Sequence, residues 1–140
     1  MALICDTGPR YAAMDEADQD HAACAALLVT SREPLVVPAP VLVELDWLAG
    51  RRLGPTAFAA FMADVVDGRI QLLDLTRGDY ARVREISVRY ADLPLGFVDA
   101  AVVAVAERLG EYKLATLDHR HYHVVRPRHT PAFILLPEIR

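Results

Sequence analysis

The sequence has few cysteines, a single lysine and no long hydrophobic run. Its two cysteines, Cys5 and Cys24, do not form a metal-type pair, and a disulfide between them is not expected in a reducing cytosol. We expect both to be small buried apolar residues. The longest apolar run, Ala100 to Ala106, is far too short to span a bilayer. No basic region precedes the first apolar stretch, so we expect no signal peptide and a cytoplasmic protein.

Several motifs of common enzyme classes are also missing. The chain has no Gly-rich phosphate loop and no Gly-x-Ser-x-Gly nucleophile elbow. Its cysteines and histidines give no zinc pattern. His119, His121 and His123 alternate, so on a strand they would share one face. We expect them to be surface or phosphate-contacting side chains, with a transition-metal site as the less favoured alternative.

The chain is long enough and apolar enough to form one domain with a buried hydrophobic core. The chain has 140 residues, 54% of them hydrophobic, so disorder is not expected and residues 1–140 are predicted to form a single domain. Its net charge is −4, which at first sight argues against a nucleic-acid partner. Residues 1–75 carry 11 acidic and 5 basic residues, whereas residues 76–140 carry 8 and 10. Charge alone therefore leaves nucleic-acid contact open.

Short apolar strands alternate with helices along the chain. The predicted strands span residues 2–6, 35–38, 70–75, 113–116 and 133–136. The predicted helices start near residue 7 and span about 20–30, 40–50, 55–66, 76–90 and 97–110. This alternation is typical of an α/β fold, with a mostly parallel central sheet and helices on both faces. In such folds, sites form beyond the carboxyl ends of strands, near the point where the strand order reverses.

Four carboxylates lie in apolar surroundings, where an acidic residue needs an explanation. Asp6 ends the first apolar run, Glu44 interrupts an apolar segment, Asp99 opens an apolar helix, and Asp118 follows an apolar strand. Burying an unpaired carboxylate costs several kcal/mol or forces it to take up a proton. Hard Mg²⁺ or Mn²⁺ prefers oxygen ligands, so a divalent cation gives a reason to gather these groups. Such a cation can activate water and offset charge that develops on a phosphate.

Each acid also has an ordinary explanation when it is taken alone. Asp6 could cap the helix that follows it, and Glu44 could reach water from a partly exposed helix. Asp99 could favour the positive end of its helix, and Asp118 could be a turn residue. Four unrelated carboxylates at four apolar junctions are harder to explain in this way. The set together favours a metal site.

Other residues near these acids have two interpretations each. Thr7 and Thr116 could orient a carboxylate or a bound water, although helix capping explains Thr7 equally well. Asp92 could support the site as an outer acid, or be an ordinary loop residue. Trp47 lies near the same helical face as Glu44. It is either a core residue or an anchor for a protein partner.

Four segments carry a resemblance to a known family. They are Ile4–Pro9, Val43–Leu45, Ala91–Glu107 and Leu114–Tyr122. In this order they resemble the motifs of the PIN-domain nucleases, and specifically of the VapC-like toxins of bacterial toxin–antitoxin systems. The third segment is the most specific match. Any one segment is weak evidence, whereas the four together cover nearly the whole chain.

The resemblance implies a function, a fold and partners. It implies a Mg²⁺-dependent endoribonuclease with a three-layer PIN-like fold, a homodimer and a cognate antitoxin. It also implies a structured RNA target, such as transfer RNA or ribosomal RNA. The family's metal roles fall on the four acids already singled out: Asp6, Glu44, Asp99 and Asp118.

Two positions depart from the family pattern. Arg10 stands where an apolar residue is common, and it could contact RNA or an acidic neighbour. Tyr122 replaces the more usual phenylalanine, which we regard as minor. Two other functions compete with the nuclease: a module that holds a cation without catalysis, and a phosphoacceptor domain. The second lacks the adjacent acidic pair near the first strand and the strand-end lysine that it would need.

Overall fold

A computed structural model describes residues 1–138 of the chain. Five strands form one sheet, in which every neighbouring pair is parallel. The strands are β1 (Leu3–Cys5), β2 (Leu35–Pro38), β3 (Ile70–Leu73), β4 (Lys113–Ala115) and β5 (Ile134–Leu136). Their order across the sheet is β3-β2-β1-β4-β5. The structure thus confirms the predicted parallel sheet, and its strands match the predicted ones to within two residues at each end.

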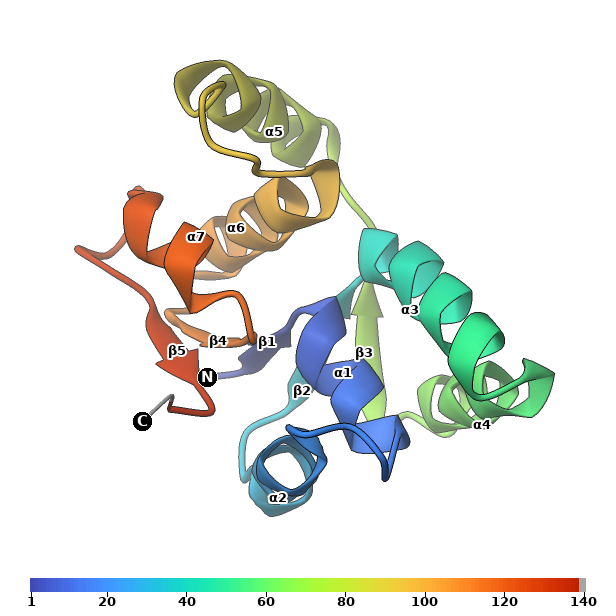
Figure 1. Cartoon of the computed structure of the whole chain (residues 1–140). Coiled ribbons are helices and arrows are strands. Elements are labelled where there is room, and N and C mark those ends of the chain that lie inside the picture. Colours follow the sequence, from blue (N-terminus) through green and yellow to red (C-terminus); the bar gives the residue numbers. More distant parts are fainter. Residues whose placement is uncertain (139–140) are drawn as a thin grey trace.

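Helices cover both faces of the sheet. They are α1 (Thr7–Met14), α2 (His21–Thr30), α3 (Ala39–Arg52), α4 (Pro55–Val66), α5 (Arg77–Arg89), α6 (Phe97–Leu109) and α7 (His119–Val124). The first four gather on one side of the sheet and the last three on the other, as Figure 1 shows. This arrangement confirms the predicted three-layer α/β fold.

The core lies around the central strand β1. All its residues are buried, and it pairs with β2 on one side and β4 on the other. The long apolar run Ala100–Ala106 lies within α6 and is buried throughout, which explains why this helix carries no polar face over those residues. Cys5 and Cys24 are both buried and free, as the composition suggested. Among residues 1–138, no helix has the length and apolar character to cross a membrane.

One expectation about local structure is wrong. Helix α3 does not end at Gly50 but continues to Arg52. The left-handed backbone conformation that favours glycine occurs at Gly54 instead, where φ is 88°. For His119 to His123 a strand was only considered, and the structure places them on the helix α7. Asp118 caps that helix by accepting a hydrogen bond from the His121 backbone N–H.

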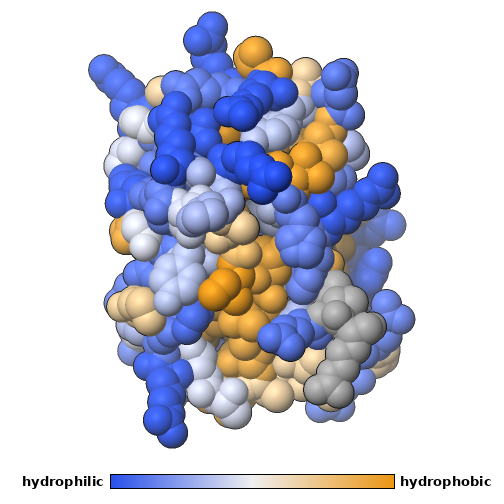
Figure 2. Space-filling view, turned by 90° about the vertical axis from the view of Figure 1, so that its left-hand side faces the viewer, coloured by the Kyte–Doolittle hydropathy of each residue, from blue (hydrophilic) through white to orange (hydrophobic). Residues whose placement is uncertain are grey.

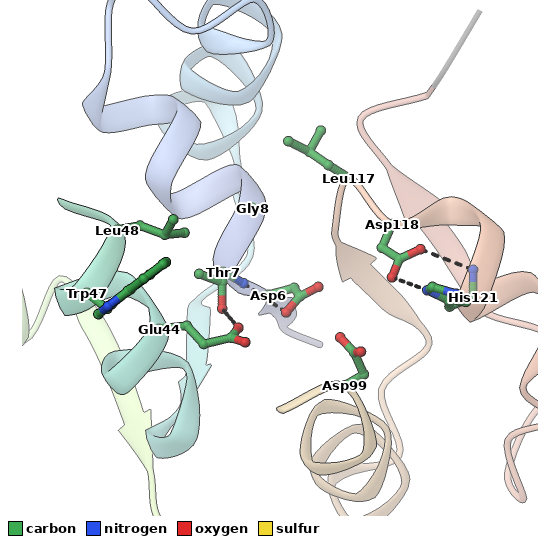
Figure 3. A pocket seen from close by; sticks show the side chains of 10 residues that line it. All are labelled: Asp6, Thr7, Gly8, Glu44, Trp47, Leu48, Asp99, Leu117, Asp118 and His121. Carbon is green, nitrogen blue, oxygen red and sulfur yellow. Dashed lines mark hydrogen bonds and ion pairs between the residues drawn. The ribbon is translucent and has the colours of Figure 1, made fainter. Parts of the chain in front are cut away.

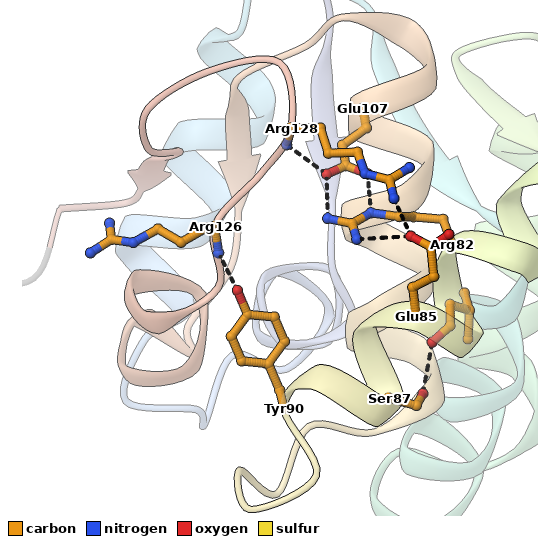
Figure 4. Close-up of polar contacts among 8 residues, drawn as sticks. Arg82, Glu85, Ser87, Tyr90, Glu107, Arg126 and Arg128 are labelled. Atoms are coloured by element: carbon orange, nitrogen blue, oxygen red, sulfur yellow. Dashed lines mark hydrogen bonds and ion pairs between the residues drawn. The ribbon is translucent and has the colours of Figure 1, made fainter.

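A polar network joins α5, α6 and the segment that leads to β5, as Figure 4 shows. The Arg82 guanidinium donates to both carboxylate oxygens of Glu107, at 2.7 and 3.0 Å. The backbone N–H of Arg128 donates to the same carboxylate at 2.8 Å, and that of Arg126 donates to the Tyr90 hydroxyl. The Arg82 and Glu107 side chains are only 10% and 9% exposed, so this arginine has a structural role.

The strand β5 forms one edge of the sheet. Figure 2 views the molecule from the left-hand side of Figure 1, where β5 and α7 lie, and shows an apolar area among hydrophilic side chains. Ile134 on β5 and Val124 on α7 are 47% and 48% exposed. This face is therefore less polar than its surroundings.

Candidate functional site

The candidate site lies where the strand order of the sheet reverses. The chain leaves β1 toward β2 on one side, and β4 occupies the other side of β1. Asp6 directly follows β1, and Asp118 follows β4 after a short connection. Because parallel strands end at the same edge of a sheet, these two carboxylates come from adjacent strand ends.

All four predicted carboxylates line one pocket of ≈ 620 Å³, shown in Figure 3. Asp6 enters it from β1, Glu44 from α3, Asp99 from the first turn of α6, and Asp118 from the start of α7. Asp92 is exposed and is not among the lining residues. The pocket is completed by six further residues: Thr7, Gly8, Trp47, Leu48, Leu117 and His121.

Asp6 is the most deeply buried of the four acids, with only 6% of its surface exposed. One carboxylate oxygen accepts a hydrogen bond from the Thr7 backbone N–H at 2.8 Å, and the other accepts one from the Thr116 hydroxyl at 2.9 Å. Burial raises the pKa of Asp6 to about 7, and the charges of Asp99 and Glu44 add to that effect. Asp6 therefore both caps α1 and contributes to the pocket.

Glu44 is held from the opposite side of the pocket by a threonine. The Thr7 hydroxyl donates to Glu44 Oε1 at 2.7 Å, a contact drawn in Figure 3. Glu44 itself is exposed on α3, so its carboxylate keeps access to solvent. Thr7 thus orients a carboxylate, the first of the two roles considered for it, while its backbone N–H serves Asp6.

Asp99 combines a local helix contact with proximity to the other acids. One carboxylate oxygen accepts a hydrogen bond from the Gly96 N–H at 3.2 Å, which stabilises the start of α6. Burial raises the pKa of Asp99, and the charges of Asp118 and Glu44 raise it further. The hydroxyl of Tyr122, 1% exposed, lies 3.5 Å from the other oxygen. Asp99 is therefore both a helix-start residue and a member of the acidic group.

Asp118 is fixed by its neighbours on both sides. Its backbone N–H donates to the Thr116 hydroxyl at 3.0 Å, the same hydroxyl that donates to Asp6. Its side chain lies 2.6 Å from His121 Nδ1. Thr116 thus couples the position of Asp6 to that of Asp118, and it is fully buried.

The donor set of the pocket suits a hard divalent cation. It offers carboxylate and hydroxyl oxygens and no thiolate, which is the chemistry that Mg²⁺ and Mn²⁺ prefer. Burial, and after it the neighbouring carboxylates, raise the pKa of Asp6 and Asp99, so that their ionised forms are unfavourable without a cation. Among residues 1–138, no three acidic, histidine or cysteine side chains are already close enough to form a complete coordination group. Ligation would thus require the side chains to draw together, or water to fill coordination positions.

Three contributors to the site were not identified from the sequence. His121 pairs with Asp118, whereas the sequence indicated only a surface or phosphate-contacting histidine. Tyr122 places its hydroxyl beside Asp99, so the replacement of phenylalanine is less minor than it seemed. Gly8 lets the start of α1 approach Leu117, since an added Cβ would lie 3.3 Å from the Leu117 Cβ. The i, i+3 spacing of Asp118 and His121 was the one signal in the sequence.

Trp47 is not a core residue. It lies at the mouth of the pocket and is 59% exposed, with the Arg51 guanidinium 4.6 Å from its ring centroid. Val43, one turn earlier on α3, is 74% exposed. An exposed tryptophan beside another apolar residue is typical of a protein-binding surface.

Known proteins match this chain over most of its length. Residues 3–127 match the PIN domain family. Ribonuclease VapC26 of Mycobacterium tuberculosis is 33% identical over 135 residues, which covers 96% of this chain and 100% of that protein.

Two solved structures share the fold. The crystal structure of Mycobacterium tuberculosis VapC20, a toxin that cleaves the Sarcin-Ricin loop, superimposes with a TM-score of 0.79 at 24% identity, covering 85% of this chain and 92% of VapC20. DNA-bound VapBC from Salmonella typhimurium gives a TM-score of 0.69 at 16% identity, covering 96% of both chains.

Proposed function

The chain belongs to the PIN-domain family as a VapC-type ribonuclease toxin, and we propose that it cleaves structured RNA, either tRNA or rRNA, in the cytoplasm with the help of Mg²⁺. Mn²⁺ is the expected substitute. The observation that carries the proposal is the convergence of four carboxylates from four separate segments on one pocket.

The residues of the pocket have distinct roles in this proposal. Asp6, Glu44, Asp99 and Asp118 would hold the cation. When bound, Mg²⁺ supplies a polarised water and offsets negative charge that develops on the phosphate. The hydroxyls of Thr7 and Thr116 hold the Glu44 and Asp6 carboxylates in place, which reduces the reorganisation needed on binding.

Mapping RNA ends after induction of the toxin tests the substrate class. We expect new 5′ ends at a small number of sites in structured tRNA or rRNA. They should be absent in cells that express Asp99→Asn, which should also grow normally. An even distribution of ends over messenger RNA would contradict the proposal. Growth arrest by Asp99→Asn would favour the alternative of a cation-binding or phosphoacceptor module without nuclease activity.

We further propose an antitoxin that covers the acidic pocket with a basic side chain and packs against α3 near Trp47. Solved relatives in complex with their antitoxins support such a partner. Trp47→Ala should then weaken the complex by roughly 2 kcal/mol or more, because exposed tryptophans at interfaces contribute disproportionately to affinity.

The control for Trp47 is Val88→Ala, which removes an exposed apolar side chain from α5 on the other side of the sheet. Its dissociation constant, measured by calorimetry, should match that of the wild type. An unchanged constant for Trp47→Ala would exclude Trp47 from the interface.

We also propose that the toxin is a homodimer. The resemblance to its family suggests it, and a chain of this size with 54% hydrophobic residues leaves apolar side chains such as Tyr80 and Phe97 stacked at the surface. Light scattering at micromolar concentration should give about twice the monomer mass of 15.5 kDa. A monomeric mass under those conditions would count against a dimer.

A further inference from the structure

Arg10 on α1 is a largely buried cation that pairs with no carboxylate among residues 1–138. Its residue surface is only 8% exposed. Among residues 1–138, its guanidinium forms no ion pair within 4.0 Å and no hydrogen bond, and Arg10 Nε has no access to solvent. Burying the Arg10 Nε–H donor without an acceptor is costly. This cost calls for an explanation beyond the fold of the free protein.

Two cavities flank Arg10, which lies on α1 between α2 and α4 (Figure 1). One, of ≈ 250 Å³, lies toward α4 and is walled by Met14 and Phe61. The other, of ≈ 310 Å³, lies toward α2 and is walled by Leu28 and Ile70. Arg10 lines both cavities, and neither shares a residue with the acidic pocket. The two sites are therefore separate.

The carboxylate nearest to these cavities does not satisfy Arg10. Asp64 lines both cavities, but its Oδ1 accepts a hydrogen bond from Arg69 Nη1 at 3.3 Å. What Arg10 does contact is an aromatic ring, since its Cζ lies 5.0 Å from the Phe61 centroid. That contact leaves the Arg10 Nε–H without an acceptor. Nε and one Nη together form an edge of the guanidinium that can bind a carboxylate in a bidentate pair.

We propose that Arg10 and its two flanking cavities form a binding site for a carboxylate that carries an apolar body. The guanidinium supplies paired donors, and the largely hydrocarbon walls of the cavities accept the rest of the ligand. Arg69 also lines the second cavity, but it pairs with Asp64. The remaining positive charge, that of Arg10, suits one negative charge better than the double charge of a phosphate monoester. The site is independent of the proposed nuclease chemistry.

A carboxylate of this kind has two sources, a free small molecule or an acidic side chain of a bound protein. Titration of the ¹⁵N-labelled toxin with hexanoate, followed at the Arg10 Nε–H resonance, tests the shared chemistry. We expect a saturable shift with hexanoate, none with hexanamide, and roughly tenfold or more weaker binding of acetate, which lacks the apolar body. Equal effects of hexanoate and hexanamide, or of hexanoate and acetate, would overturn the proposal.

The same titration on the co-purified toxin–antitoxin complex distinguishes the sources. If an acidic side chain of the partner fills the site, the Arg10 resonance should already be shifted and hexanoate should have no effect. If the ligand is a small molecule, hexanoate should bind the complex as it binds the free toxin. Because RNA cleavage is not the readout, a failure of the nuclease proposal does not affect this test.

Arg10→Met separates a binding role from a structural one. It keeps the bulk of the side chain and removes the unpaired charge, so the free protein should melt at the same or a higher temperature, cleave RNA normally and lose the hexanoate response. Arg77→Met, which removes an exposed guanidinium from α5 outside both cavities, should retain that response. A lower melting temperature for Arg10→Met, with no hexanoate response in the wild type, would show that Arg10 only stabilises the fold by packing against the Phe61 ring.

Discussion

Asp99→Asn is expected to abolish RNA cleavage and to leave the metal-free protein as stable as the wild type or more stable. Asn keeps the shape of the side chain and an oxygen that can accept the Gly96 N–H, but it removes a charge. Two unit charges about 4 Å apart interact by roughly 1 kcal/mol in water and about 4 at an effective dielectric of 20. Burial raises the pKa of Asp99, and the charges of Asp118 and Glu44 raise it further, so its charge is unfavourable without a cation.

The melting temperature and RNA cleavage, measured together, decide whether Asp99 binds the cation or only stabilises the start of its helix. Added Mg²⁺ should raise the melting temperature of the wild type more than that of Asp99→Asn, because a ligand stabilises the state that binds it. The matched control is Asp92→Asn, an exposed acid outside the pocket, which should cleave normally. If Asp99 only stabilises its helix, Asp99→Asn should melt lower and remain active, and this result would remove it from the catalytic set.

The stability of the metal-free protein should fall as the pH rises from about 4 to about 7. The folded state holds the proton of Asp6 up to a pKa of about 7, whereas the unfolded chain releases it near 3.8. The folded state therefore binds more protons in this window, so the stabilisation is complete below the unfolded pKa and disappears as the pH rises through the folded one. The shift corresponds to at most about 4 kcal/mol.

Mg²⁺ should reverse this trend, because the cation and the proton compete for the same carboxylates. The increase in melting temperature on adding Mg²⁺ should be larger at about pH 8 than at about pH 6, and cleavage should fall as the pH drops below about 7. Asp6→Asn serves as the control, since it should lose most of the pH dependence. An equal Mg²⁺ effect at both pH values would show that Asp6 does not ligate the cation.

The fold followed from the sequence because its signals are local. Short apolar strands alternate with helices, and this pattern predicts a parallel sheet with Asp6 and Asp118 at strand ends. That these two strands are neighbours is a finding of the structure. The convergence of Glu44 and Asp99 on the same pocket depends on how α3 and α6 pack. That packing depends on contacts between segments distant in the sequence. The order of the motifs suggested that these two acids meet only through the resemblance to the family.

Other features could not be predicted because they depend on single turns or on burial. The alternating histidines resembled a strand face, yet the cap formed by Asp118 starts a helix and brings His121 back to it. Trp47 belongs to an apolar segment but lies on the solvent side of α3. The isolation of Arg10 is visible only once the packing of α1 shows which acceptors are out of reach.

Cleavage of a defined structured RNA by the purified protein, with Mg²⁺ and with excess EDTA, tests the central claim most directly. The four-carboxylate pocket predicts cleavage with Mg²⁺ or Mn²⁺, none in EDTA, and recovery when the cation is restored in excess. Full activity in excess EDTA would contradict a metal-dependent mechanism at Asp6, Glu44, Asp99 and Asp118.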